Sequence, residues 1–243
     1  MSFLEIKNLS VEIDGKKILD NLNLNVQKGE VCVLMGPNGS GKTTLSKTLM
    51  GHPKCKITSG EILFNGEDII KIPVNEKAKK GLFLSFQYPQ EISGVTISNF
   101  LRTAYNAVKE KKLPPSEFLK LVEEKTSILS MDRKFLSRYL NEGFSGGEKK
   151  KAEILQMLFL NPKIAILDET DSGLDIDSLR IVANGIKNFM NKEKAILLIT
   201  HYKRILDYIK PDKVFVMKNG RIVQQGGGEL IQEIEEKGYE GLK

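Results

Sequence analysis

The stretch that decides the fold is VCVLMGPNGSGKTT, residues 31–44. Its first five residues, 31–35, are apolar, as expected of a strand buried on both faces of a sheet. The next eight, Gly36–Thr43, match the phosphate-loop pattern G-x-x-x-x-G-K-[ST], and a helix-like stretch, Thr43 to Met50, follows directly. A strand, a glycine-rich loop and a helix in this order predict an α/β fold built on a largely parallel sheet.

The glycine-rich loop has the chemistry of a polyphosphate site. Its glycines allow backbone N–H groups to point at phosphate oxygens, and the N-terminus of the following helix adds to the attraction. Lys42 is expected to reach the β- and γ-phosphates of ATP, and the Thr43 hydroxyl to bind Mg²⁺. The predicted ATP contacts here are Gly36, Pro37, Asn38, Gly39, Ser40, Gly41, Lys42, Thr43 and Thr44. A chance glycine turn is the competing interpretation, and the flanking strand and helix argue against it.

Composition limits the class of protein. The 243 residues contain 37 Lys and Arg against 31 Asp and Glu, a net charge of +6, with 40% hydrophobic residues and only two Cys. Such a chain is not disordered, and it lacks the cysteines for a disulfide framework or a C-x-x-C zinc site. Because the lysines are mostly interleaved with acids, the charge indicates a solvated surface and no nucleic-acid partner.

Targeting signals are also missing from the sequence. The longest apolar runs, such as Ala195–Ile199, are far shorter than a membrane span, and residues 1–10 do not resemble a signal peptide. We therefore expect a cytoplasmic protein with no direct membrane insertion, or a plastid protein if a transit peptide has been removed.

The patterns on either side of the loop predict a single domain over residues 1–243. Apolar and polar residues alternate through the first forty residues, with turns at Asp14-Gly15 and Lys28-Gly29, which predicts short antiparallel strands. Helical spacing dominates roughly residues 90–156, which we interpret as a helical subdomain inserted in the α/β core. A hairpin hinged on Asn219-Gly220 and a charged helix are expected near the end.

Two adjacent carboxylates follow a second buried strand, Ile164–Leu167. An acid that ends a buried parallel strand lies at the same sheet edge as the phosphate loop. Asp168 is suited to a Mg²⁺ shell, and Glu169 to taking the proton of an attacking water. Alone the pair is a weak signal, but together with the phosphate loop it predicts the other half of a nucleotide site.

Further motifs make a family resemblance specific. The sequence FSGGE at residues 144–148, downstream of the phosphate loop and shortly before the two carboxylates, resembles the signature of ABC-type ATPases. Gln87 resembles the Q-loop glutamine of that family, Ser172–Asp175 its D-loop, and His201 its switch histidine. Six motifs in family order cover essentially the whole chain. A lone His201 would more often be a buried core histidine, but its position after an apolar strand favours the family role.

The resemblance implies a mechanism in which two copies enclose two ATP molecules. In this family the signature closes over nucleotide held by the opposite subunit, which implies a transient ATP-driven homodimer. The resemblance adds Ser145, Gly146, Gly147, Glu148 and Asp175 to the ATP contacts. It implies a catalytic set of Glu169, His201, Lys42 and Gln87, and Mg²⁺ ligands Thr43, Gln87 and Asp168.

Longer segments are similar to one branch of the family, the SufC ATPases of iron–sulfur cluster assembly. They include residues 86–95, 143–150, 167–175 and 200–208, together with Gly238-Tyr239. The resemblance implies partners of the SufB/SufD scaffold type, whose conformation the ATPase would drive. We expect the docking surface near residues 88–101, with Ile92, Val95 or Phe100 as apolar anchors.

Some residues depart from the family pattern, and others that could suggest a site are interpreted as having no functional role. No aromatic residue stands near Val11–Asp14 to stack on adenine, and Glu148 replaces the commoner Gln. Lys149–Lys151 is interpreted as helix surface. Cys32, Cys55 and His52 are interpreted as core or incidental residues.

Two other functions share the ATPase core. The nucleotide-binding subunit of a membrane transporter has the same chemistry, and only the branch-specific segments argue against it. A DNA-repair or chromosome-structure ATPase would need long heptad arms between the phosphate loop and the signature, which this chain lacks.

Overall fold

A six-stranded sheet forms the centre of the computed structural model, which describes residues 3–201, 203–239 and 241. Its strand order is β12-β11-β3-β10-β9-β6, parallel from β11 to β6 with β12 antiparallel at the edge. The strands are β3 (Val31–Met35), β6 (Leu82–Ser85), β9 (Ile164–Asp168), β10 (Ala195–Ile199), β11 (Lys213–Lys218) and β12 (Arg221–Gly226). The predicted mixed central sheet is confirmed.

The first part of the chain forms a separate antiparallel sheet, as its alternating pattern predicted. Its order is β2-β1-β4-β5. Its strands are β1 (Leu4–Ile13), β2 (Lys16–Val26), β4 (Lys56–Phe64) and β5 (Glu67–Asp68). The β1–β2 turn has Asp14 at φ 50° and Gly15 at φ 76°. Two consecutive left-handed residues are what a two-residue hairpin turn of matching twist requires.

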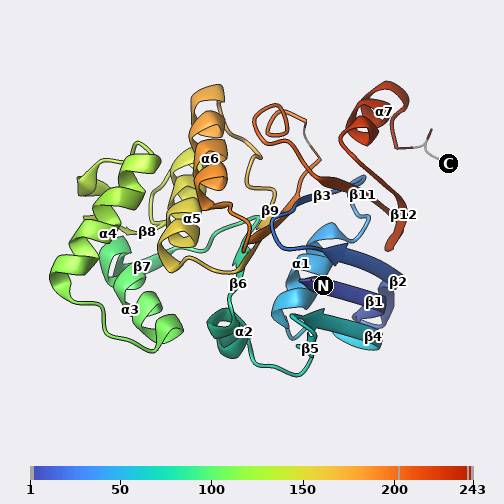
Figure 1. The fold of residues 1–243 in the computed structure, drawn as a ribbon, viewed down its shortest axis with the longest axis horizontal. Helices are drawn as coiled ribbons and strands as arrows, with labels where there is room; N and C mark the ends of the chain where they lie inside the picture. Colours follow the sequence, from blue (N-terminus) through green and yellow to red (C-terminus); the bar gives the residue numbers. More distant parts are fainter. Residues whose placement is uncertain (1–2, 202, 240, 242–243) are drawn as a thin grey trace.

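Strand β3 separates two hydrophobic cores because its side chains alternate between the faces of the sheet. Val31, Val33 and Met35 face the core that contains α5 (Gly146–Leu160) and α6 (Ile176–Phe189). Cys32 and Leu34 face the core that contains α1 (Lys42–Met50) and the antiparallel sheet. Figure 1 shows these layers on opposite sides of the central strands. Full burial of a leucine such as Leu34 contributes about 1.5–3 kcal/mol. The phosphate loop is thus anchored from both sides.

The middle of the chain is mostly helical, as predicted, with one addition. It contains α3 (Ile97–Lys109), α4 (Pro115–Ile128), the 3₁₀ turn η1 (Arg133–Ser137) and α5. Two short strands, β7 (Ile92–Thr96) and β8 (Tyr139–Leu140), pair antiparallel across this region. The ring of Phe159 on α5 meets the rings of Tyr105 and Phe118 edge-on, at 5.6 and 5.5 Å, which ties α3 and α4 to α5.

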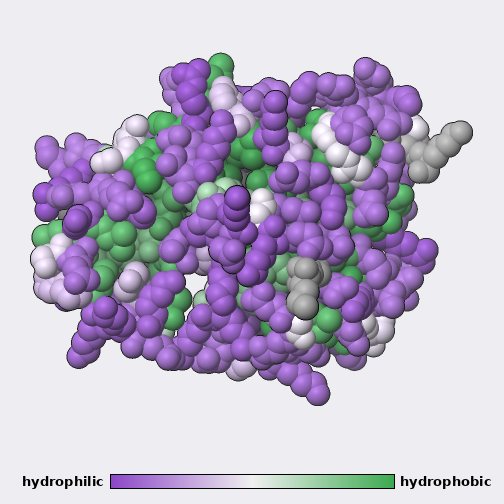
Figure 2. Space-filling view, viewed as in Figure 1, coloured by the Kyte–Doolittle hydropathy of each residue, from purple (hydrophilic) through white to green (hydrophobic). Residues whose placement is uncertain are grey.

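Two further helices are α2 (Val74–Lys80) and α7 (Glu229–Lys237). Among the described residues, no helix has the length and apolar character needed to cross a bilayer. The face in Figure 2 is largely hydrophilic, with apolar side chains gathered between α4 and α5.

Candidate functional site

The phosphate loop follows β3 and runs into α1, and its shape requires glycine. A Cβ on Gly36 would lie 2.2 Å from the carbonyl oxygen of Met217 in β11. Gly41 has φ 111°, and a Cβ there would lie 2.8 Å from Cδ2 of Leu19. Both approaches are closer than real Cβ contacts allow, so the loop packs against two sheets only because these positions lack side chains.

Lys42 curls back over the loop that precedes it. Its Nζ donates hydrogen bonds to the carbonyl oxygens of Gly36 at 2.7 Å and Pro37 at 3.0 Å. Burial lowers the pKa of Lys42, while the charges of Glu169 and Asp168 oppose this shift. The amine therefore lies over the loop, where a phosphate could replace the carbonyl groups as its partner.

A cleft of about 430 Å³ opens beside this lysine at the N-terminus of α1. Gly41 at the helix start offers no side-chain cap, so the first N–H groups of α1 have no side-chain acceptor there. The cleft is lined by Ile18, Asn38, Gly39, Gly41, Lys42, Thr43, Thr44, Gln87 and Glu169. This combination of free helix N–H groups, a lysine and hydroxyls fits a polyphosphate.

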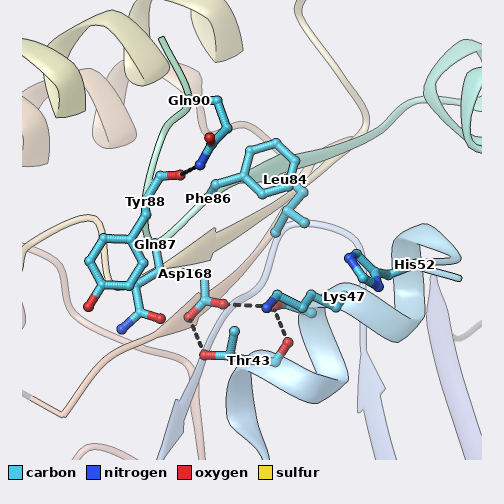
Figure 3. Close-up of a pocket in the computed structure, with 10 residues that line it drawn as sticks. Thr43, Lys47, His52, Leu84, Phe86, Gln87, Tyr88, Gln90 and Asp168 are labelled. Carbon is cyan, nitrogen blue, oxygen red and sulfur yellow. Dashed lines mark hydrogen bonds between the residues drawn. The ribbon is translucent and has the colours of Figure 1, made fainter. Parts of the chain in front are cut away.

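Asp168 ends β9 directly behind the phosphate loop. Its Oδ2 accepts a 2.7 Å hydrogen bond from Ser46 Oγ, and its Oδ1 a long 3.5 Å bond from Thr43 Oγ1 (Figure 3). Burial raises the pKa of Asp168; the Ser46 hydrogen bond opposes this shift and the charge of Glu169 adds to it. Ser46 was not predicted from the sequence. Its place one helical turn after Thr43 was the available signal.

The oxygen donors around Asp168 fit a magnesium ion held together with phosphates. The described residues include no group of three or more His, Cys, Asp or Glu side chains that could hold a metal by themselves. Mg²⁺ is commonly held by one or two carboxylates with water and substrate phosphates, so the Thr43 hydroxyl and the Asp168 carboxylate are an adequate protein contribution.

Three predicted catalytic residues converge from the loops after β6, β9 and β10. Gln87 Nε2 donates a 2.7 Å hydrogen bond to Glu169 Oε2, and His201 Nδ1 lies 3.3 Å from Glu169 Oε1. The backbone of Glu169 is in the left-handed region, with φ 50°, and its N–H donates to the carbonyl oxygen of Ile199. The carboxylate is therefore oriented from two sides at the mouth of the cleft. Gln87, predicted to sense Mg²⁺ and phosphate, bonds to Glu169 in this structure.

A second buried carboxylate joins the loops after β9 and β10. Thr200 Oγ1 donates a 2.7 Å hydrogen bond to Asp171 Oδ2, and burial raises the pKa of Asp171. This bond holds the loop that carries Glu169 against the loop that carries His201. Asp171 and Thr200 lie in the family-like segments 167–175 and 200–208, but no pattern in the sequence predicts that the two side chains meet.

The signature residues form the start of α5. Ser145 Oγ accepts a hydrogen bond from the N–H of Glu148, and Glu148 Oε2 accepts one from the N–H of Ser145, a capping box. Arg138 Nη1 lies 2.5 Å from Glu148 Oε1, and the backbone bond from Ser145, followed by Arg138, lowers the pKa of Glu148. The carboxylate in place of the family's usual Gln is thus paired with an arginine.

The signature and the cleft do not share residues in this chain. None of residues 145–148 is among the residues that line the cleft. Asp175, predicted to contact ATP, is also outside the lining and caps α6, where its Oδ1 accepts from the N–H of Ser178 at 2.7 Å. The cleft therefore presents the phosphate loop, Gln87 and Glu169, without the signature.

Lys150, Phe100 and Cys32 are all at least partly buried, which differs from the sequence-based prediction for the first two. Lys149–Lys151 is not a plain surface run, because Lys150 is only 5% exposed and bonds to the carbonyl oxygens of Phe86 and Gln87. Phe100 packs against the core that contains α5 and α6, so it is less suited to anchor a partner than was expected. Cys32 is buried, and burial raises the pKa of its thiol.

A smaller cavity of about 280 Å³ lies between α1 and the segment after β6 (Figure 3). Phe86, Tyr88 and Gln90 face Lys47 and His52 across it. Phe86 is 53% and Tyr88 is 75% exposed, more than Ile92 at 39%. Tyr88 begins the segment 88–101 in which the docking surface was predicted, whereas Phe86 lies before that segment and was not predicted as a surface residue. Tyr202, part of the segment 200–208, lies outside the described residues.

Comparison with known proteins decides the family. The model of the family described as "ABC transporter" matches residues 19–172. The chain belongs to the ABC ATPase family. It is 55% identical to "Probable ATP-dependent transporter ycf16" of Cyanophora paradoxa, over 98% of this chain and 94% of that protein. It is 52% identical to "Vegetative protein 296" of Bacillus subtilis (strain 168), over 100% and 95%. A solved "ATP binding subunit of ABC transporter" superposes with TM-score 0.82 at 26% identity, covering 97% of this chain and 94% of that one.

This ABC ATPase is accordingly an ATP-binding component. Ile18 of β2 also lines the cleft, beside Gly41, and was not predicted from the sequence as a site residue. An aliphatic side chain there agrees with the lack of an aromatic residue in the first hairpin.

Proposed function

We propose that this ABC ATPase hydrolyses ATP with Mg²⁺ as a pair of copies, each cleft being closed by the signature of the other. The observation that carries the proposal is the convergence of Gln87 and His201 on Glu169, whose side chain lines the same cleft as Lys42, while no signature residue lines that cleft. One copy supplies the phosphate loop and the catalytic side chains. The second supplies the N-terminus of α5, whose positive dipole end favours a γ-phosphate.

In this mechanism the loop N–H groups and Lys42 hold the phosphates, and a Mg²⁺ ion, when bound, would supply positive charge against the charge that develops on them. Thr43 and Asp168 would hold that ion. Glu169 takes the proton of the attacking water, and Gln87 and His201 keep its carboxylate oriented. The resemblance to the family's switch histidine supports a hydrogen bond from His201 to the γ-phosphate. Ser145, Gly146 and Gly147 of the second copy complete the shell, with Glu148 stabilising their backbone through the capping box.

Replacing Glu169 by Gln tests the role of the base. The amide keeps the size of the side chain but cannot take a proton, so hydrolysis should fall by about 10²–10⁴-fold. ATP binding should persist, and the closed pair should accumulate in size-exclusion chromatography with light scattering. Undiminished hydrolysis would remove Glu169 from this role.

We further propose that the ATPase is of the SufC type and drives conformational change in SufB/SufD-type scaffold proteins. The branch-specific segments of the sequence support this role. The exposed aromatic residues Phe86 and Tyr88 support a docking surface beside Gln87, where nucleotide state could be transmitted to a partner.

Tyr88→Asp tests the docking surface. It should weaken binding to a purified scaffold by about 30-fold or more, since it places a charge in the centre of an apolar contact. Leu119→Asp is the matched control, because Leu119 is 44% exposed on α4, outside this surface. Equal binding by both variants would contradict the location.

The alternative is a nucleotide-binding subunit of a membrane transporter; in its favour, the Cyanophora paradoxa relative is named a probable ATP-dependent transporter. Affinity purification from the native cell separates the two functions. Scaffold proteins without membrane spans support the SufC-type role, and a hydrophobic permease would contradict it.

A further inference from the structure

An ion pair is buried in the middle of α5. Lys150 and Glu153 lie one helical turn apart, with Nζ and Oε2 separated by 3.6 Å and their side chains 6% and 5% exposed. Charged side chains are rarely buried this deeply without specific partners, because removing them from water is costly. The remaining hydrogen bonds of the pair therefore indicate what it does.

All of the other bonds reach one short segment at the end of β6. Glu153 Oε2 accepts from Ser85 Oγ at 2.7 Å, and Glu153 Oε1 accepts from the N–H of Phe86 at 2.8 Å. Lys150 Nζ donates to the carbonyl oxygens of Phe86 and Gln87, each at 3.0 Å. The two side chains thus bind the Ser85 hydroxyl, the backbone N–H and carbonyl of Phe86, and the backbone carbonyl of Gln87.

This segment carries the glutamine that reaches the proposed base. The side chain of Gln87 bonds to Glu169 Oε2 at 2.7 Å, while its backbone carbonyl is held by Lys150. A bonded chain therefore leads from α5 through Gln87 to Glu169. The same helix begins at the signature cap Ser145.

A contact that only stabilised the core would not need two charges, since well-packed apolar side chains often serve as well. Here each charge satisfies backbone groups of an irregular segment that has no strand partner beyond Ser85. Directional bonds of this kind fix the path of a backbone, which apolar packing does less well.

We propose that Glu153 is a positioning residue for ATP hydrolysis: it fixes residues 85–87 so that the Gln87 amide orients Glu169. The inference rests on the proposed function, in which Glu169 is the base. It assigns a role to a residue outside the cleft, and it makes the signature helix and the catalytic glutamine move as one unit.

The first test is a double-mutant cycle on ATP hydrolysis. Glu153→Gln keeps the side-chain size but removes the charge, and we expect kcat to fall about ten-fold to a hundred-fold, with ATP affinity within about two-fold of the unmodified protein. In a Gln87→Ala background, adding Glu153→Gln should lower kcat further by less than about two-fold, because the effect of Glu153 passes through Gln87. An equal loss in both backgrounds, or an unchanged kcat, would overturn the proposal.

A matched control separates positioning from stability. Met157→Ala removes buried bulk from the same helix, where Met157 is 0% exposed, but leaves the hydrogen bonds of Lys150 and Glu153 to residues 85–87 in place. It should lower the melting temperature while leaving kcat within about two-fold. If Met157→Ala lowers kcat as much as Glu153→Gln does, Glu153 acts through general stability.

Nuclear magnetic resonance and hydrogen exchange need no ATP hydrolysis, so they test the role of Glu153 separately from the proposed function. The side-chain amide signal of Gln87, assigned in nuclear magnetic resonance spectra by its loss in Gln87→Ala, should shift in Glu153→Gln and stay in place in Met157→Ala. The N–H of Phe86 should exchange about ten-fold faster or more in Glu153→Ala, because it loses a bond to a charged acceptor. Unchanged signals refute the inference, whereas absence of ATP hydrolysis in the unmodified protein refutes the proposed function alone.

Discussion

The hydrogen bond from Ser46 to Asp168 offers a quantitative prediction. Ser46→Ala removes the 2.7 Å donor to Oδ2 and leaves Asp168 only the long 3.5 Å bond from Thr43. A hydrogen bond to a charged group contributes about 1.5–3 kcal/mol. Ser46 and Asp168 are 1% and 2% exposed, so water can replace little of that energy. For a chain of this size the loss corresponds to a melting temperature lower by about 3–12 °C.

The control for this prediction lies on the same helix. Thr48 is also 1% exposed, and its hydroxyl donates at 2.7 Å to the backbone carbonyl of Thr44, a neutral acceptor. Thr48→Val should therefore cost only about 0.5–1.5 kcal/mol. Differential scanning calorimetry at pH 7 measures both. A smaller loss for Ser46→Ala than for Thr48→Val would refute the view that Ser46 mainly stabilises a buried charge.

Three further predictions concern single side chains. Lys42→Ala should abolish binding of a fluorescent ATP analogue, because it removes the amine over the phosphate loop; retained tight binding would overturn that role. Arg138→Ala removes the partner of Glu148 in an ion pair whose side chains are 38% and 36% exposed, so it should lower the free energy of unfolding by about 0.2–1 kcal/mol in denaturant titration; an increase would contradict this pairing. Burial raises the pKa of Asp171 above its ordinary value of 3.8, so the free-energy cost of burying its charged carboxylate is full above the raised folded-state pKa and shrinks as the pH falls through that pKa. The stability of the unmodified protein relative to Asp171→Asn should thus increase from pH 7 towards pH 4, and a decrease would contradict the burial effect.

The features that the sequence predicted are those with strong local signals. The all-apolar strand β3, the phosphate loop and the carboxylates after β9 each combine a hydrophobic run with a fixed chemical pattern, so their shared sheet edge follows from topology. The hairpin on Asn219-Gly220 also forms, with φ 50° and 77°. These elements decide where the cleft lies.

The features that the sequence missed depend on distant contacts. Lys150 stands in a run of three lysines, which normally indicates a solvated surface, and only the buried Glu153 and the carbonyl groups after β6 explain its position. The β7–β8 pair joins residues more than forty positions apart through few hydrogen bonds, so no local turn sequence predicts the pairing. The bond from Gln87 to Glu169 likewise joins two loops that only the folded sheet brings together.

The central claim, that two copies build each ATP site, can be tested by complementation. Lys42→Ala damages the phosphate loop, and Ser145→Arg damages the signature, so neither variant alone should hydrolyse ATP. In an equal mixture half of the pairs combine the two variants, and one of the two sites in such a pair is intact, which predicts about a quarter of the unmodified rate. A mixture as inactive as its components, or a Ser145→Arg variant that is active alone, would contradict the account.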